Sequence, residues 1–209
     1  MINNMEAFVI AITILTLTPG LDTALVIRNA SRGGRVDGFA TSFGICLGLF
    51  VHAALSAIGI SAILAQSAEW FNLIKMVGAG YLIWLGISTL KKAWKAKAMV
   101  SGSEIRQPDI EITRSLREGF LSNILNPKTA VFYLAFLPQF IDPKGSALLQ
   151  SGAMASIHFI IAMIWQCGLA QTLVATKRLL NSPTFMRRME VTTGLVLIGL
   201  GTKLLLEEA

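Results

Sequence analysis

The chain has 209 residues, of which 54% are hydrophobic and only 14% are charged, and its formal net charge is +6. Soluble domains are roughly one quarter charged, so this composition excludes an ordinary soluble protein. The basic residues cluster between hydrophobic runs and form no basic face interleaved with aromatic side chains, which argues against a nucleic-acid partner. We therefore expect an integral membrane protein surrounded by the lipid bilayer.

Long apolar runs predict the transmembrane helices. Residues 39–68 and 145–176 contain no Asp, Glu, Lys or Arg, and each run exceeds the ~20 residues that a helix needs to cross ~30 Å of hydrocarbon. Over the whole chain, hydropathy predicts an all-α integral membrane protein with six transmembrane helices, at residues 5–27, 39–64, 70–90, 118–141, 147–175 and 189–206.

The basic residues predict the orientation of these spans. Fourteen of the eighteen Lys and Arg residues lie in the three segments that follow the first, third and fifth spans. Cytoplasmic loops carry such an excess, so these segments are expected in the cytoplasm and both termini on the opposite, periplasmic side.

A polar segment at about 91–117 divides this single membrane domain, residues 1–209, into two halves of three spans each. We interpret the segment as a cytoplasmic linker between repeat 1, about 1–90, and repeat 2, about 118–209. Because each half has an odd number of spans, the halves enter the membrane from opposite sides, as in inverted-repeat transporters.

The first and fourth spans each contain a proline, Pro19 and Pro127. Proline removes a backbone donor and frees the carbonyl one turn earlier. Thr18 and Asn126 precede the two prolines and are good N-cap residues. We therefore predict that helices 1 and 4 are broken at Pro19 and Pro127, with Gly20 at the first break; the alternative is a pair of ordinary kinks. Half-helix N-termini at such breaks carry partial positive charge, which suits a substrate carboxylate.

Each predicted break carries an ionisable residue, Asp22 at the first and Lys128 at the second. A charge within a span costs several kcal/mol, about 2.5–3.5 on insertion scales, so it usually faces a partner or a water-filled path. We hypothesise that Asp22 and Lys128 form an ion pair or hold the two charges of a zwitterion, and that Asp22 couples transport to protons. The alternatives are helix capping by Asp22 and snorkelling of Lys128 to a headgroup.

Two histidines lie within predicted spans. His52 shares a helix face with Gly44, Gly48 and Ser56, and small residues at this spacing let two helices approach closely. His52 and His158 are therefore interpreted as hydrogen-bonded packing residues, with a proton relay as the alternative. Two histidines without carboxylates or thiols at ligand spacing predict no metal site.

Catalytic motifs are absent from the sequence. It contains no G-x-S-x-G, Walker loop, H-E-x-x-H or Gly-rich dinucleotide turn. Neither an enzyme nor a cofactor is therefore indicated. Pumping by this chain would be driven by an ion gradient or by the substrate gradient, unless a separate ATPase subunit exists.

Several stretches along the chain share the pattern of one family. They are Thr18–Asp22, Arg28–Asn29, Gly33–Gly38, Gly44–His52, Lys75–Gly86, Gly119–Asn123, Asn126–Lys128, Ala135–Phe140 and Gly194–Gly201. Over essentially its whole length the chain resembles the lysine-exporter (LysE) superfamily, and within it the homoserine/threonine-resistance (RhtB) branch. Leu21 departs from the pattern, because family members usually carry a second proline there.

The resemblance implies a small exporter of neutral amino acids, such as homoserine, threonine or leucine, in a bacterial inner membrane. It further implies proton antiport and allows a homodimer. Gln139, in one of the shared stretches, is a further candidate site residue.

Two other functions fit the sequence less well. Related branches export divalent cations, but Asp22 is the only carboxylate deep in a span, whereas a hard cation prefers several oxygens. A thiol-redox membrane protein needs paired cysteines, and Cys46 and Cys167 each stand alone in an apolar segment.

Overall fold

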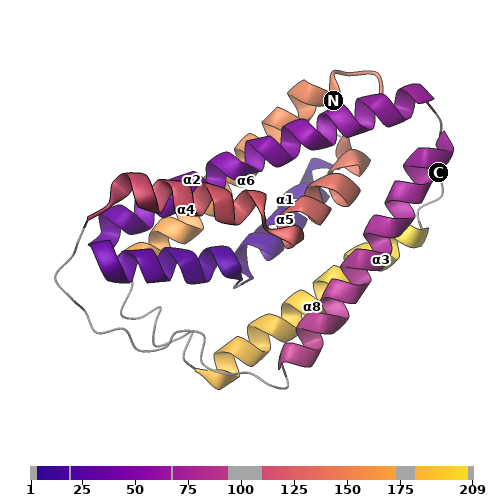
Figure 1. Cartoon of the computed structure of the whole chain (residues 1–209). Helices are drawn as coiled ribbons and strands as arrows, with labels where there is room; N and C mark the ends of the chain where they lie inside the picture. Colours follow the sequence, from indigo (N-terminus) through magenta and orange to yellow (C-terminus); the bar gives the residue numbers. More distant parts are fainter. Residues whose placement is uncertain (1–3, 19, 67, 94–109, 173–181, 207–209) are drawn as a thin grey trace.

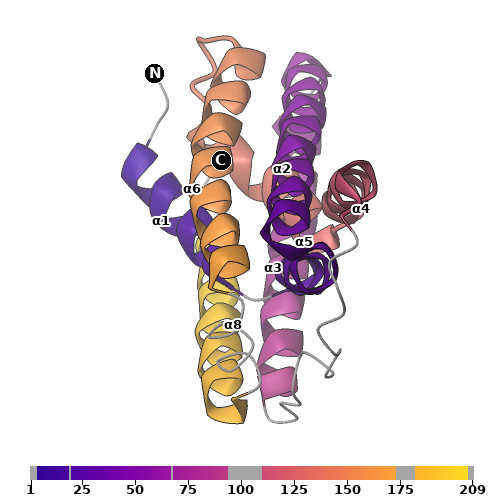
Figure 2. The same ribbon diagram turned by 90° about the vertical axis from the view of Figure 1, so that its left-hand side faces the viewer.

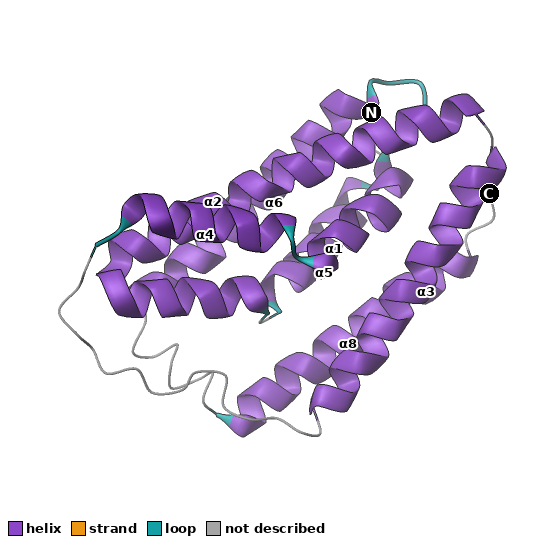
Figure 3. Ribbon diagram, in the orientation of Figure 1, coloured by secondary structure: helices purple, strands orange, loops and turns teal. Residues whose placement is uncertain are grey.

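The computed structural model describes residues 4–18, 20–66, 68–93, 110–172 and 182–206. Within these ranges every regular element is a helix and no strand occurs (Figure 3), so the predicted all-α class is confirmed. The elements are α1 (Met5–Leu17), α2 (Leu21–Gln66), α3 (Ala68–Ala93), α4 (Ile112–Ile124), α5 (Pro127–Val131), the π-helix η1 (Phe132–Phe136), the 3-10 helix η2 (Leu137–Phe140), α6 (Ala147–Gln171) and α8 (Pro183–Leu206). Most of the linker predicted at 91–117 lies outside the described residues.

Helix α2 bends sharply at Gly34, whose φ of 75° and ψ of −164° are not helical. Glycine adopts a positive φ without steric cost because it has no Cβ. The bend divides α2 into a short arm, residues 21–33, and a long arm, residues 35–66, which run in different directions (Figure 1). The basic segment after the first predicted span, expected as a loop, is therefore helical on both sides of Gly34.

The long arm of α2 packs against α4 on one side and α6 on another (Figure 2). Glycines make the α2–α4 contact close: a Cβ at Gly44 would overlap the carbonyl oxygen of Leu116, and one at Gly119 would overlap that of Thr41. A Cβ at Gly48 would lie 2.6 Å from Oδ1 of Asn123. The small-residue face predicted on this helix therefore lies against α4.

Helices α3 and α8 lie side by side (Figures 1 and 2). A Cβ at Gly86 would lie 2.7 Å from the carbonyl oxygen of Gly194, and a Cβ at Gly201 would lie 2.8 Å from that of Ala79. Small residues at helix contacts are typical of membrane proteins, where close backbone approach maximises packing.

The irregular segment that follows α5 runs through the main hydrophobic core. Phe132, Tyr133 and Leu137 are completely buried there. The ring of Phe140 packs edge-on against Phe8 of α1, with 5.4 Å between ring centroids. π-Helical turns often mark functional sites, and η1 contains the buried Tyr133, whereas η2 carries the ring that packs on α1.

Two helices in the described part of the chain are long and apolar enough to cross a membrane by length and composition alone. They are residues 21–59 of α2 and the whole of α6, whereas α1 and residues 76–91 of α3 are shorter apolar helices. The first predicted span is divided between α1 and α2, and the fourth between α4 and the helices that begin with α5, so neither span is one continuous helix. The six-span topology therefore stays a prediction.

Candidate functional site

Two interruptions between helices lie close to the prolines of the predicted first and fourth spans. Helix α1 ends at Leu17 and α2 begins at Leu21. Helix α4 ends at Ile124 and α5 begins at Pro127. Pro19 itself lies outside the described residues. Hydrogen bonds between the two interruptions show that they are adjacent in space.

The residues before the two prolines have opposite capping roles. Oδ1 of Asn126 accepts a hydrogen bond of 3.1 Å from the backbone N–H of Lys128, so its predicted N-cap role is confirmed. The predicted N-cap role of Thr18 is wrong, because Thr18 caps the C-terminus of α1 and its hydroxyl donates to the carbonyl of Ile14 at 2.7 Å. Threonine can bond back to the carbonyl four residues earlier, and the residue before a proline favours the extended backbone that Thr18 adopts.

The two prolines free two carbonyl groups, and both find a partner from another helix. Proline has no N–H, so the carbonyl four residues earlier loses its helical donor; these carbonyls belong to Leu15 and Asn123. Nζ of Lys128 donates to the Leu15 oxygen at 2.9 Å. Nε2 of His52 lies 3.0 Å from the Asn123 oxygen, which also accepts from the backbone N–H of Asn126 at 3.0 Å. The interruptions are therefore stabilised by side chains that reach them from elsewhere in the fold.

Asp22 lies in the first turn of α2, half-buried, and its carboxylate is held by the second interruption. Oδ1 accepts from the hydroxyl of Ser122 at 2.9 Å. Oδ2 accepts from the side-chain amides of Asn123 and Asn126, each at 3.1 Å. Three uncharged donors thus surround a carboxylate that also complements the positive end of its own helix.

Lys128 makes the reciprocal connection. Its ammonium donates to the carbonyl of Leu15 and, at 3.4 Å, to that of Thr18. A cation is unfavourable near the N-terminus of its own helix but favourable at a helix C-terminus, and the last turn of α1 has no basic residue of its own. Each interruption therefore supplies the charged group that binds the other.

Asp22 and Lys128 do not form a direct ion pair, since the ion pairs found in the described ranges all lie elsewhere. The ion pair, one of the two hypothesised arrangements, is therefore not formed in this structure, and the binding of a zwitterion stays a hypothesis. The hydrogen bonds of Asp22 run to α4 and α5, and those of Lys128 run to α1. We call the two adjacent helix interruptions, with Asp22 and Lys128, the crossed site.

A line of buried polar side chains adjoins the crossed site. Nδ1 of His158 lies 3.1 Å from the hydroxyl of Tyr133, and its Nε2 lies 3.0 Å from Oγ1 of Thr16. The Tyr133 ring stacks on His158 and lies beside His52, with 5.9 Å between centroids in both cases. The hydroxyl of Ser56 donates to the Tyr133 carbonyl at 2.7 Å. Both histidines are buried and hydrogen-bonded, and they connect α2, η1, α6 and α1.

Reasoning from sequence did not single out several of these residues. Ser122 and Asn123 were noted only within a stretch of family resemblance, although with Asn126 they fall on one side of a helix end. Thr16 gave no signal, because one threonine in an apolar helix is common. Gln139, a predicted candidate, does not join the crossed site, since its amide donates to the carbonyl of Ala135 in η1 at 3.3 Å.

Cys46 and Cys167 are both free thiols. Sγ of the buried Cys46 lies 3.9 Å from the carbonyl oxygen of Phe159 on α6. Within the residues that the structure describes, no group of three or more His, Cys, Asp or Glu side chains could hold a metal ion.

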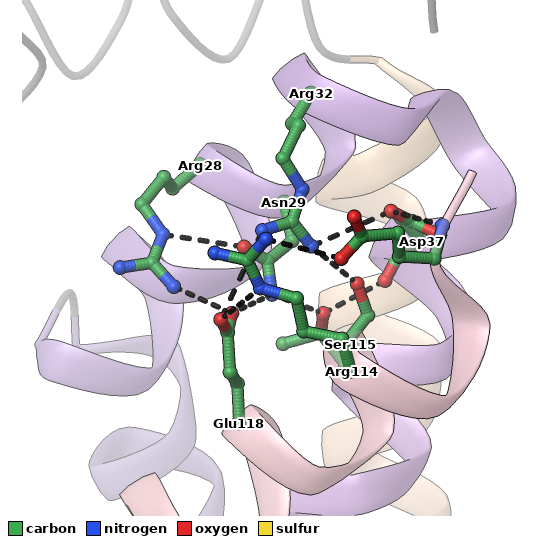
Figure 4. Close-up of polar contacts among 9 residues, drawn as sticks. Arg28, Asn29, Arg32, Asp37, Arg114, Ser115 and Glu118 are labelled. Atoms are coloured by element: carbon green, nitrogen blue, oxygen red, sulfur yellow. Dashed lines mark hydrogen bonds and ion pairs between the residues drawn. The ribbon is translucent and has the colours of Figure 1, made fainter. Parts of the chain in front are cut away.

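A second polar cluster lies at the Gly34 bend, and we call it the bend cluster (Figure 4). Its labelled members are Arg28, Asn29, Arg32, Asp37, Arg114, Ser115 and Glu118. Glu118 of α4 accepts from Arg28 at 2.6 Å, from Asn29 at 3.0 Å and from Arg114 at 2.9 Å. This carboxylate therefore joins α4 to the short arm of α2.

Asp37, on the other side of the bend, is completely buried. It accepts from the backbone N–H of Glu111 at 3.1 Å and pairs with Arg32 at 3.6 Å. Arg32 also donates to Ser115 at 2.9 Å. The bend cluster thus holds both arms of α2 against the start of α4, on the side that the basic residues assign to the cytoplasm.

Comparison with known proteins decides the family. A family model described as LysE type translocator matches residues 13–208. The chain belongs to the LysE translocator family. The resemblance found in its motifs is thereby confirmed, and it covers nearly the whole chain.

Relatives of this LysE translocator are named as membrane or efflux proteins. It is 32% identical to the uncharacterized membrane protein YrhP of Bacillus subtilis, over 96% of this chain and 98% of the relative. It is 27% identical to the homoserine/homoserine lactone efflux protein of Salmonella typhi, over 95% of this chain and 94% of the relative. No solved structure matches it significantly. The LysE translocator is therefore a membrane protein of an exporter family.

Proposed function

We propose that this LysE translocator is a secondary carrier that exports neutral amino acids, resembling homoserine, threonine or leucine, from the bacterial cytoplasm. The observation that carries the proposal is the crossed site, where Asp22 and Lys128 place opposite charges at two adjacent helix interruptions without pairing directly. A zwitterion is complementary to such a pair of separated charges. The efflux protein of Salmonella typhi, whose name specifies homoserine, supports the substrate class.

Proton antiport fits the position of Asp22. Protonation of this carboxylate removes a negative charge close to where a substrate ammonium would bind, so the proton and the substrate oppose each other's binding. Antiport requires this mutual opposition. The donors Ser122, Asn123 and Asn126 hold the ionised carboxylate in place, and the Ser122 hydroxyl can also accept a hydrogen bond from a protonated one.

We further propose six spans arranged as two inverted repeats, about 1–90 and 118–209, with both termini in the periplasm. The carbonyls of Leu15 and Asn123, four residues before the two prolines, each lie against a side chain from another helix, and this similarity supports the arrangement. Irregular backbone at membrane depth is tolerated where it lines a cavity or is buried in protein. The homodimer stays a prediction.

Counterflow in proteoliposomes tests the function. Vesicles are preloaded with one unlabelled amino acid, and uptake of its labelled form is followed for neutral, acidic and basic amino acids. We expect accumulation with one or a few neutral amino acids, and an imposed pH gradient should drive net movement. If no amino acid exchanges in well-folded protein, the proposal fails.

A further inference from the structure

The C-terminal end of α1 forms a small cup of carbonyl oxygens occupied by a side-chain ammonium. Nζ of Lys128 donates to the oxygens of Leu15 and Thr18, at 2.9 and 3.4 Å. Leu15 has lost its helical donor to Pro19, and helix C-termini carry partial negative charge. Gly20 lies beside the cup, since a Cβ there would stand 3.9 Å from this ammonium.

We propose that this carbonyl cup is the subsite for the substrate's α-ammonium, and that Lys128 occupies it only while no substrate is bound. The inference rests on the proposed function. An α-ammonium and a lysine ammonium are both primary, with three N–H donors each, so one can replace the other on the same two oxygens. Lys128 is thus an internal stand-in for part of the substrate.

The replacement explains a preference for zwitterions. When the α-ammonium enters the cup, the displaced Lys128 ammonium needs a new anionic partner, because an unpaired charge at this depth is costly. The substrate's own carboxylate provides that partner. A simple amine carries no carboxylate, so it would leave Lys128 unpaired and cannot displace it. In this account Lys128 is the residue that discriminates amino acids from amines.

The test measures binding of n-propylammonium to purified protein by thermal shift, with tetramethylammonium as the ion that has no N–H donor. In Lys128→Met the cup loses its occupant. We expect n-propylammonium to stabilise this variant at a concentration at least about tenfold below that needed by the wild type, a difference of one power of ten in affinity. Tetramethylammonium should stabilise neither. Lys144→Met, which changes an exposed lysine, should behave as the wild type.

The proposal is overturned if Lys128→Met binds n-propylammonium no better than the wild type, or binds tetramethylammonium equally well. Lys128 would then be only a helix cap. Should Lys128→Met fail to fold, the same comparison is made with Lys128→Ala, which also removes the ammonium from the Leu15 carbonyl. Amine binding does not depend on amino-acid counterflow. If amines bind as expected but no amino acid shows counterflow, the proposed function is rejected. If amino acids show counterflow but amines do not bind as expected, the subsite is rejected.

Discussion

Asn126 shows how one side chain can serve both the local fold and the site. Its Oδ1 caps α5 by accepting from the backbone of Lys128, while its Nδ2 donates to Asp22. An amide is the side-chain group that offers both an acceptor and donors. The two roles can therefore be separated by substitutions that keep one and lose the other.

Asn126→Asp keeps the capping oxygen but places a second carboxylate against Asp22. We expect counterflow to fall at least about tenfold, corresponding to ~1.4 kcal/mol or more, and the repulsion between the like charges to lower thermal stability as well. Asn126→Ala loses the cap as well and should lower the free energy of unfolding by about 1 kcal/mol. Wild-type counterflow in Asn126→Asp would show that the contact with Asp22 has no role in transport.

At the scale of elements, the contact between α2 and α4 positions the crossed site, because α4 carries Ser122 and Asn123 to Asp22. Gly44 and Gly119 allow the two backbones to touch. Packing at such contacts replaces the hydrophobic effect as the force that associates helices in lipid. The bend cluster joins the same two helices near Gly34.

Gly44→Ala tests the close approach. The added methyl group would overlap the carbonyl of Leu116, so the helices must separate. We expect a loss of about 1–3 kcal/mol in unfolding free energy, typical of overpacking, together with reduced counterflow. Gly59→Ala on the same helix is the matched control, because nothing lies within 4 Å of its new Cβ. Equal stability of the two variants would contradict the described packing.

Asp37→Asn tests the bend cluster. This change removes a completely buried charge that pairs with Arg32 and accepts from the Glu111 backbone. We expect the midpoint of thermal unfolding to fall by an amount corresponding to about 1–3 kcal/mol, the cost of a poorly satisfied buried group. Glu111→Gln removes only an exposed pair with Arg114 and should change stability by less than about 1 kcal/mol. A larger loss of stability in Glu111→Gln than in Asp37→Asn would refute the structural role given to Asp37.

At the scale of the whole molecule, composition and hydropathy were sufficient to predict a helical membrane protein, because they depend only on the solvent that each segment prefers. The prolines indicated where helices end, and the cost of buried charge marked Asp22 and Lys128. The direction in which Thr18 caps, the bend at Gly34 and the reach of Lys128 to α1 could not be predicted. These features depend on contacts between different segments, which a single sequence does not encode locally. Lys128 and Leu15, for example, are more than 100 residues apart in the chain.

Counterflow of one transported neutral amino acid by Asp22→Asn and by Lys128→Met, in parallel, tests the central claim that the two helix interruptions form one site. The exposed residues Glu6 and Lys144 provide the charge-matched controls Glu6→Gln and Lys144→Met. The counterflow rate of both crossed-site variants should fall at least about tenfold, corresponding to ~1.4 kcal/mol or more. Both controls should keep the wild-type rate. Full activity of either crossed-site variant, in protein that folds as the wild type does, would contradict the account.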